Sequence, residues 1–205
     1  MDSLVISDGV AMLIPRVFSS NTYLLHGSEN IIIDPGCGDS NGLVKALSEF
    51  SVKASSVSRV YYTHMHFDHI GSGYLFPEAE HWMHEEDAVH VNNKNDDATY
   101  AYSAKDFKYP EITNFMKGGE RIKVNDLKLE AFHAPGHTSG STCFLERKEG
   151  LMFSGDVLFP KYNIGRWDLY SGNQEQQLKT VEEVRKLPWT TLLPGHEMLE
   201  KRELK

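Results

Sequence analysis

The first 36 residues of the chain alternate short apolar runs with turn residues. The runs are rich in Val, Ile, Leu and Tyr, which suit a pleated and partly buried surface. Gly, Ser, Asn and an Asp-Pro-Gly sequence separate the runs, and these residues favour tight turns. The pattern predicts three or four antiparallel strands, at residues 4–6, 11–14, 22–25 and 31–33.

Helices and strands then follow one another up to residue 91. A helix is predicted at 41–50, because Leu43, Val44 and Leu47 lie on one helical face. The β-branched and aromatic segment at 58–63 predicts a strand that runs into a loop. The elements predicted after it are a short helix at 70–76, a strand at 79–83 and a short helix at 85–91.

From residue 121 onward the chain repeats the order of strands followed by a helix. Residues 174–187 form the strongest helical pattern, which Pro188 ends. Its apolar stripe consists of Leu178, Val181, Val184 and Leu187. The predicted strands lie at 121–124, 127–133, 141–146, 151–154 and 190–193. Strands followed by helices, twice over, predict an α/β protein with two sheets sandwiched between helices in a single domain, 1–205.

Residues 92–117 depart from this order. The segment is rich in Tyr and Phe, carries mixed charge and contains Pro110, so we interpret it as a helical insertion or a lid. Its aromatic side chains either cover a substrate's acyl group or pack in the core, and the sequence leaves both open. The residues concerned are Tyr100, Tyr102, Phe107, Tyr109 and Phe115.

Composition excludes several classes of protein. The 205 residues carry 21 Lys and Arg against 29 Asp and Glu, a net charge of −8, which argues against nucleic acid as the main partner. Cys37 and Cys143 are too few for a disulfide framework or a thiolate zinc finger. The apolar runs fall short of the roughly 18 residues of a membrane span, and residues 1–10 contain no basic stretch. We therefore expect a cytoplasmic protein, without a membrane partner, that acts on a small molecule; the oligomeric state stays open.

The ten histidines are the unusual feature of the composition, and three of them lie within six residues. His64, His66 and His69 follow the strand at 58–63 together with Asp68. In an extended backbone residues two apart face the same way, so His64 and His66 can converge on one point. Asp68 could also cap the helix that follows. Imidazoles and a carboxylate in this pattern predict a metal site.

Three more positions have the same form, a strand end followed by a glycine and then a metal-ligand type. They are His137, Asp156 and His196. The glycine before each permits the sharp bend needed to aim strand ends at one centre. Five His and two Asp exceed the four ligands of one zinc ion, so we expect two divalent ions that share a carboxylate. Zinc is the expected metal, with iron or manganese as alternatives.

The remaining candidates have weaker support. Asp34 ends a very apolar strand, and it is either a turn former before Pro35 or a residue that orients a ligand histidine. His133, four residues before His137, is the other histidine most expected near the site. We interpret His26, His81, His84 and His90 as surface or core residues, Cys143 as a core thiol and Cys37 as a loop thiol.

These motifs, in this order, resemble the metallo-β-lactamase superfamily and most closely its glyoxalase II-like hydrolases. They are THMHFDHIG at 63–71, PGHTSGS at 135–141, GD at 155–156 and PGH at 194–196. The resemblance implies an αββα sandwich of two mixed sheets, with the site at one edge between them. It implies a first metal at His64, His66 and His137 and a second at Asp68, His69 and His196, with Asp156 bridging.

Differences from the family pattern restrict the activities that we expect of this chain. Lactamases of this family usually have Cys or Ser near the position of Asp156, so the aspartate argues against antibiotic hydrolysis. Glyoxalase II also has a C-terminal helical domain, and only residues 197–205 follow His196, so we expect that half of the thiol site to be missing. The GRWD segment at 165–168 resembles one in short glyoxalase-like enzymes, where Arg166 would meet a substrate carboxylate; alternatively, Arg166 pairs with Asp168.

The resemblance implies a hydrolase of an ester or thioester, such as an S-acyl thiol, in which hydroxide held between the metals attacks the carbonyl. Asp68 would be the catalytic residue that binds metal and orients this hydroxide. One alternative is an iron persulfide dioxygenase with a single metal at His64, His137 and Asp156. The others are an acyl-homoserine lactonase, a ribonuclease of the same superfamily, which the acidic charge disfavours, and a metal protein without catalysis.

Overall fold

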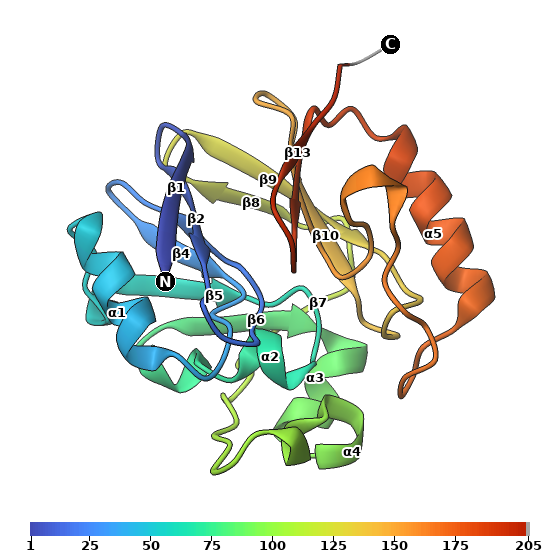
Figure 1. Ribbon diagram of the computed structural model, residues 1–205, viewed down its shortest axis with the longest axis horizontal. Helices are drawn as coiled ribbons and strands as arrows, with labels where there is room; N and C mark the ends of the chain where they lie inside the picture. Colours follow the sequence, from blue (N-terminus) through green and yellow to red (C-terminus); the bar gives the residue numbers. More distant parts are fainter. Residues whose placement is uncertain (204–205) are drawn as a thin grey trace.

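The structure is a computed structural model that describes residues 1–203, and it contains two β-sheets packed face to face with helices on the outside (Figure 1). The first sheet has seven strands in chain order. These are β1 (Asp2–Ser7), β2 (Val10–Ile14), β3 (Thr22–Leu25), β4 (Asn30–Ile33), β5 (Val57–Tyr61), β6 (Glu80–His84) and β7 (Asn114–Met116). Strands β1 to β4 pair antiparallel and β4 to β7 pair parallel, so the sheet is mixed.

The second sheet has six strands in the order β13-β12-β11-β10-β9-β8. They are β8 (Arg121–Val124), β9 (Leu127–His133), β10 (Thr142–Glu146), β11 (Leu151–Gly155), β12 (Thr191–Pro194) and β13 (Glu200–Lys201). Only β11 and β12 pair parallel within it. The α-helices are α1 (Ser40–Glu49), α2 (Phe67–Ile70), α3 (Glu85–Asn92), α4 (Asp96–Thr99) and α5 (Gln174–Lys186).

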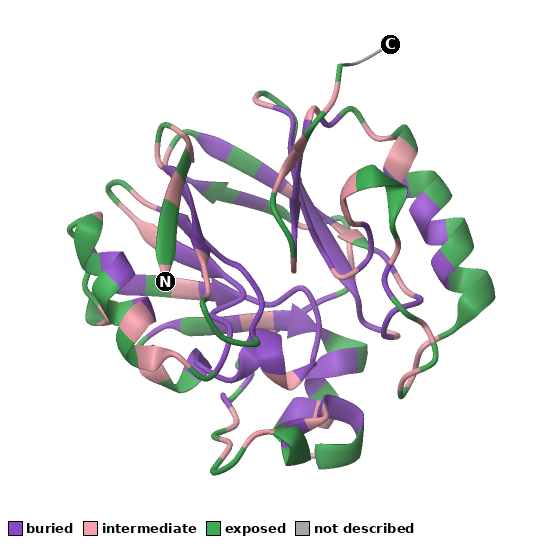
Figure 2. Cartoon of the chain, viewed as in Figure 1, coloured by how far each residue is buried: buried purple, intermediate pink, exposed green. Residues whose placement is uncertain are grey.

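Alternation along the strands produces three apolar layers. Ile31 and Ile33 of β4 face the second sheet, whereas Ile32 between them faces outward and packs with residues of α1. On the far side, β10 and β11 pack their outer faces against Val181 and Val184 of α5. Figure 2 shows the consequence, with buried strands at the centre and helices exposed on their outer faces only. The predicted α/β class and αββα layering are therefore confirmed.

Short 3-10 helices connect several of these elements, at Ala54–Ser56, Gly73–Leu75, Ala101–Ser103 and Pro160–Tyr162. The single helix predicted at 70–76 is wrong, because α2 ends at Ile70 and a separate turn follows. Helix α2 begins earlier than expected, since the extended backbone of His66 forms its N-cap. Asp68 therefore lies inside the first turn and does not cap the helix.

Two other predictions about packing need correction. Leu178 does not belong to the buried stripe of α5 but is 51% exposed, because Gln177 and Val181 face the core instead. Residues 92–117, interpreted as a helical insertion or a lid, contain the short helix α4 and also the edge strand β7, which the pattern does not predict. Phe107 and Tyr109 pack against the core, and Phe115 is exposed on β7. Among residues 1–203, no helix has the length and apolarity needed to cross a bilayer.

Candidate metal centre

The seven predicted ligands follow the ends of strands from both sheets and lie close together where these ends meet. Asp34 follows β4 and His64 follows β5, and these strands run parallel, so their carboxyl ends share one edge. Asp156 and His196 follow the parallel strands β11 and β12 in the same way. Backbone hydrogen bonds from Thr142 N to Thr63 O, at 2.8 Å, and from Asn21 N to Gly195 O, at 2.7 Å, join the two edges.

Three buried imidazoles form the first ligand group. The Nε2 atom of His64 lies 3.1 Å from Nδ1 of His66 and 3.2 Å from Nε2 of His137. The Nδ1 atom of His66 lies 3.0 Å from Nε2 of His137, which closes the triangle. Four ligands arranged tetrahedrally around zinc at 2.0–2.1 Å lie about 3.3 Å apart, so the triangle has nearly the size of one face of such a site.

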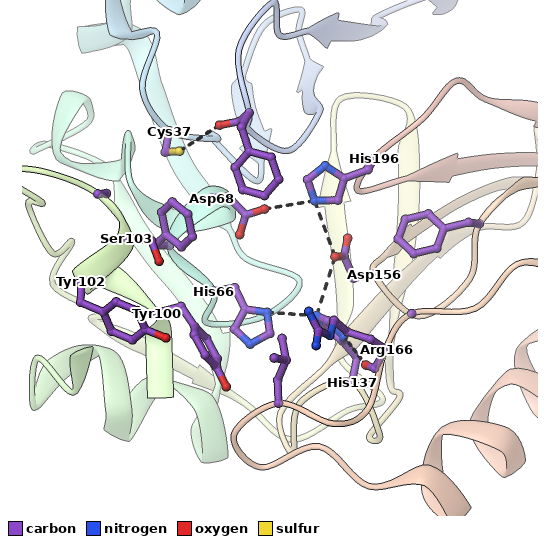
Figure 3. A pocket seen from close by; sticks show the side chains of 16 residues that line it. Cys37, His66, Asp68, Tyr100, Tyr102, Ser103, His137, Asp156, Arg166 and His196 are labelled. Atoms are coloured by element: carbon purple, nitrogen blue, oxygen red, sulfur yellow. Dashed lines mark hydrogen bonds and ion pairs between the residues drawn. The ribbon is translucent and has the colours of Figure 1, made fainter. Parts of the chain in front are cut away.

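Asp68, His69 and His196 form a second group that can hold a metal ion. Asp68 Oδ2 lies 3.1 Å from Nε2 of His196. Asp156 stands between the two groups: one carboxylate oxygen is 3.3 Å from His69 Nε2, and the other is 3.6 Å from His196 and 3.7 Å from His137. Figure 3 shows Asp156 between His137 and His196, and Asp68 next to His196. A carboxylate in this place can serve both groups.

Hydrogen bonds assign the protons in the first group. Thr63 Oγ1 donates to Asp34 Oδ2 at 2.6 Å, so it accepts from His64 Nδ1 at 3.0 Å. His137 Nδ1 donates to the carbonyl of Arg166 at 2.7 Å. A neutral imidazole has one donor and one acceptor nitrogen, so the Nε2 atoms of His64 and His137 both carry lone pairs that face each other.

The second group also has a ring nitrogen that faces a carboxylate. His69 Nδ1 donates to Asp34 Oδ2 at 2.8 Å, so Nε2, which lies 3.3 Å from Asp156 Oδ1, is the nitrogen available to a metal ion. Within residues 1–203, His69 Nε2 and Asp156 Oδ1 are buried without a hydrogen-bond partner. Buried polar atoms without partners are costly, and a cation bound between the ligand atoms would remove that cost. The donor set therefore fits metal ions.

Burial sets the charge state of the imidazoles. It lowers the pKa of His64, His66 and His137, with the neighbouring imidazoles acting in the same direction on each, and that of His66 falls to about 3. These three rings are therefore neutral at pH 7, the state that binds metal. Burial also lowers the pKa of His69, but the carboxylates of Asp156 and Asp34 outweigh it and raise the pKa well above its usual value. A proton on His69 thus competes with a metal ion.

The carboxylates stay ionised despite burial. Burial raises the pKa of Asp156, but His69, His196 and His137 outweigh it and hold that pKa well below the usual range. The pKa of Asp68 is also lowered, because the hydrogen bond from His196 overcomes the effect of burial. Two negative charges within a cluster of five imidazoles attract divalent cations.

A cavity of about 1010 Å³ opens onto this cluster. Aromatic rings line it on two sides. On one side Phe18 and Phe159 pack against His196, and Phe67 stacks on Phe18. On the other side Tyr100 packs against His66, and Tyr102 packs against Tyr100 (Figure 3). The remaining residues that line it are Cys37, Asp68, Ser103, Ala104, His137, Asp156, Gly165, Arg166 and Leu169. The aromatic residues of the segment 92–117 are thus divided, since Tyr100 and Tyr102 face the cavity and the others do not.

The weaker candidates lie as follows. Asp34 is 1% exposed and holds both Thr63 and His69, so its contacts go beyond those of a turn former. The exposed guanidinium of Arg166 pairs with Asp168 at 2.8 and 2.7 Å. His133 does not join the cluster, but stacks on His84 with ring centroids 4.0 Å apart. Burial raises the pKa of the Cys37 thiol to about 11.

Sequence reasoning missed two residues that hold the ligand loops. Asp87 of α3 accepts hydrogen bonds from both loops that carry the three-histidine group. Asn21 donates to the carbonyls of Pro194 and Glu197 on either side of His196. Neither lies in a motif, since Asn21 belongs to a predicted turn and Asp87 to the helix predicted at 85–91.

The family pattern described as "Metallo-beta-lactamase superfamily" matches residues 15–196, so the chain belongs to this superfamily. "Probable metallo-hydrolase MJ0888" of Methanocaldococcus jannaschii is 32% identical over 87% of this chain and 88% of its own length. "Hydroxyacylglutathione hydrolase GloC" of Haemophilus influenzae is 28% identical over 86% and 81%. Human "Acyl-coenzyme A thioesterase MBLAC2" is 27% identical over 93% and 79%. These relatives support an enzyme of the hydrolase type.

Solved structures show the same fold. The BLEG-1 B3 metallo-beta-lactamase superposes with a TM-score of 0.79 at 24% identity, over 93% of this chain and 92% of that one. TTHA1623, solved in a di-iron-bound form, superposes with a TM-score of 0.76 at 23% identity, over 93% of each chain. At these identities the likeness supports the fold alone.

Proposed function

We propose that this chain is a two-metal hydrolase of thioesters or esters whose acyl group is apolar. The observation that carries the proposal is the pair of ligand groups on either side of Asp156, in each of which the ligand atoms lie within 4.8 Å of one another. In the proposed assignment His64, His66 and His137 hold one ion and Asp68, His69 and His196 hold the other, with Asp156 shared. Two ions held there would supply Lewis-acid chemistry, lowering the pKa of bound water to about 7 and polarising a carbonyl oxygen.

The residues of the chain would divide the remaining work. Asp68 lines the cavity, and one of its oxygens bonds to His196, so the other is free to orient an attacking water. Asp34 holds the ring of His69 through Nδ1 and so fixes which nitrogen faces the metal. Arg166 keeps His137 in the correct tautomer through its carbonyl. In this proposal the side chain of Arg166 also contacts a carboxylate of the substrate.

The cavity wall supports the choice of an apolar acyl group. Phe18 is 75% exposed, and its ring stacks on Phe67 and on His196 with centroids 6.1 Å apart in each case. Exposed aromatic surface at the mouth of a cavity marks a place for an apolar ligand. An acyl chain beside Phe18 and Phe159 would lie next to the second ligand group, with its carbonyl carbon at the metal centre.

Zinc is the proposed metal, because a tetrahedral arrangement of imidazoles and carboxylates suits it. Iron suits the same donors, and one solved neighbour is described in a di-iron-bound form. We expect the substrate to be a small molecule that reaches the site from water, and a cytoplasmic location stays a prediction.

The test is elemental analysis of protein purified without added metal, followed by assays on thioesters, lactones and phosphodiesters. We expect two metal ions per chain and turnover of S-acyl thiols. Replacement of Asp156 by Ala should lower metal content and abolish turnover together. One iron per chain, with oxygen consumption on a glutathione persulfide, would overturn the proposal in favour of the dioxygenase. Turnover of acyl-homoserine lactones alone would make the chain a lactonase.

A further inference from the structure

A buried aspartate outside every motif joins the two loops of the three-histidine group. Asp87 lies in α3, is fully buried and points its carboxylate between those loops. Its Oδ2 accepts from Met65 N at 3.0 Å and from Thr138 Oγ1 at 2.7 Å, and its Oδ1 accepts from Gly140 N at 2.8 Å. Met65 stands between His64 and His66, and Thr138 follows His137. One carboxylate thus fixes the positions from which all three imidazoles project.

The three partners select a carboxylate at this position. Met65 and Gly140 present backbone N–H groups, and the Thr138 hydroxyl donates as well, so all three neighbours are donors. An ionised carboxylate accepts on both oxygens, whereas an amide would turn an NH2 group toward one of the backbone donors. The packing is close, because a Cβ atom on Gly140 would lie 2.6 Å from the Asp87 carboxyl carbon. The loops have little room to find other partners.

The second ligand group is supported by other residues. Asn21 donates from Nδ2 to the carbonyls of Pro194 at 3.1 Å and Glu197 at 2.8 Å, which hold the loop of His196. Tyr23 donates to the same Pro194 carbonyl at 2.6 Å. None of these contacts involves Asp87. Asp87 and Asn21 therefore hold different ligand groups, whereas Asp34 contacts His69 directly and His64 through Thr63.

We propose that Asp87 is a positioning residue that organises the three-histidine metal site, and that Asn21 does the same for His196 in the other site. The proposal rests on the proposed function, because it presumes that both groups bind metal. Residues that orient ligands typically change metal affinity by about 10–100-fold when replaced. Loss of the Asp87 carboxylate should therefore weaken one ion of the two, and loss of the Asn21 amide should weaken the other.

The experiment measures zinc affinity and stoichiometry by competition with a chromophoric chelator, which needs no substrate. We expect Asp87→Asn to retain one tight ion and to weaken the other by about 10–100-fold. Glu86→Gln is the matched control, since it removes the same charge from an exposed neighbour on the same helix and should bind two ions like the wild type. Unfolding profiles of the metal-free proteins show whether each variant folds.

Double variants identify the weakened site. In a His196→Ala background, where the three-histidine site remains intact, Asp87→Asn should lower the affinity for the remaining ion by about 10–100-fold. In a His66→Ala background the same change should have an effect below about twofold, because the site it supports is already broken. Asn21→Ala should give the opposite pattern in the two backgrounds.

A second variant covers the case in which Asp87→Asn does not fold. Thr138→Val removes one hydrogen bond and keeps the charge, whereas Thr138→Ser keeps the hydroxyl. We expect Thr138→Val to weaken one ion and Thr138→Ser to restore it. If the wild type binds two ions and every folded Asp87 and Thr138 variant binds both with unchanged affinity, the positioning role is wrong and the proposed function stands. If the wild type binds no metal, the proposed function itself fails.

Discussion

The Nε2 atoms of His64 and His137 lie 3.2 Å apart, and each is the lone-pair nitrogen of its ring. Thr63 and the carbonyl of Arg166 hold the protons on the opposite nitrogens. Two lone pairs at this distance repel each other in a buried site, where the effective dielectric constant is low. The folded chain thus keeps two acceptors together that only a shared cation would stabilise.

Asp34 should control metal affinity through His69. Replacing Asp34 by Ala removes the acceptor for His69 Nδ1 and the partner of the Thr63 hydroxyl. The ring of His69 then loses its preferred tautomer, and we expect zinc affinity to fall by about 10–100-fold. Chelator competition measures the change, with the exposed Asp126→Asn as control. An unchanged zinc affinity would show that Asp34 only forms the turn before Pro35 and does not orient His69.

Phe18 should set the preference for acyl length. We expect Phe18→Ala to lower kcat/KM for long acyl thioesters by about tenfold, since burying an aromatic ring contributes about 1.5–3 kcal/mol. Turnover of acetyl thioesters should change little, because a short acyl group does not reach the ring. Phe115→Ala is the control, as Phe115 is 54% exposed on β7, away from the cavity. Equal losses for short and long acyl groups would place the acyl chain elsewhere.

The Arg166–Asp168 pair offers a test between its two interpretations. The two side chains are 61% and 62% exposed, so loss of the pair should change stability little. If Arg166 meets a substrate carboxylate, Arg166→Ala should raise KM for anionic thioesters and leave KM for neutral ones unchanged. Asp168→Ala should then lower KM for the anionic ones, because it frees the guanidinium. If neither variant changes KM selectively for anionic thioesters, the pair only holds the loop in place.

Burial raises the pKa of Asp87 from 3.8 to about 6, which gives stability a pH dependence. The folded state holds this proton more tightly than the unfolded state, so the contribution of Asp87 is complete below pH 4 and declines as pH rises to about 6. The loss is about 3 kcal/mol at 1.36 kcal/mol per pKa unit. The difference in unfolding free energy between metal-free wild type and Asp87→Asn, followed from pH 4 to 7, isolates this group. A pH-independent difference would show that Asp87 is ionised throughout.

The seven clustered residues were predictable because each belongs to a local pattern with a physical purpose. Three histidines and an aspartate follow one strand, and a glycine introduces each of the other three at a bend. Asp87 could not be found in this way. It follows Glu85 and Glu86 at the start of a helix, where acidic residues are favoured by the helix dipole whatever they contact. Only the packing of α3 against both loops shows that one of the three faces inward.

Most strands of the fold and its layers were also predictable from the sequence. Apolar runs such as 31–33 identify buried strands, and the repeated order of strands and helices predicts the layers. Leu178 misled the prediction for α5, because a long amphipathic pattern does not say which edge of its apolar stripe the core takes. The strand β7 was missed, since three residues of sequence Asn-Phe-Met are too short to carry an alternating pattern.

Anomalous diffraction from crystals grown with zinc would show whether two metal ions share Asp156. We expect two peaks about 3.5–4 Å apart. One should lie within about 2.3 Å of the nitrogens of His64, His66 and His137, and the other should contact Asp68, His69 and His196. A single peak, or two peaks of which only one touches Asp156, would mean that this carboxylate is not shared between two ions.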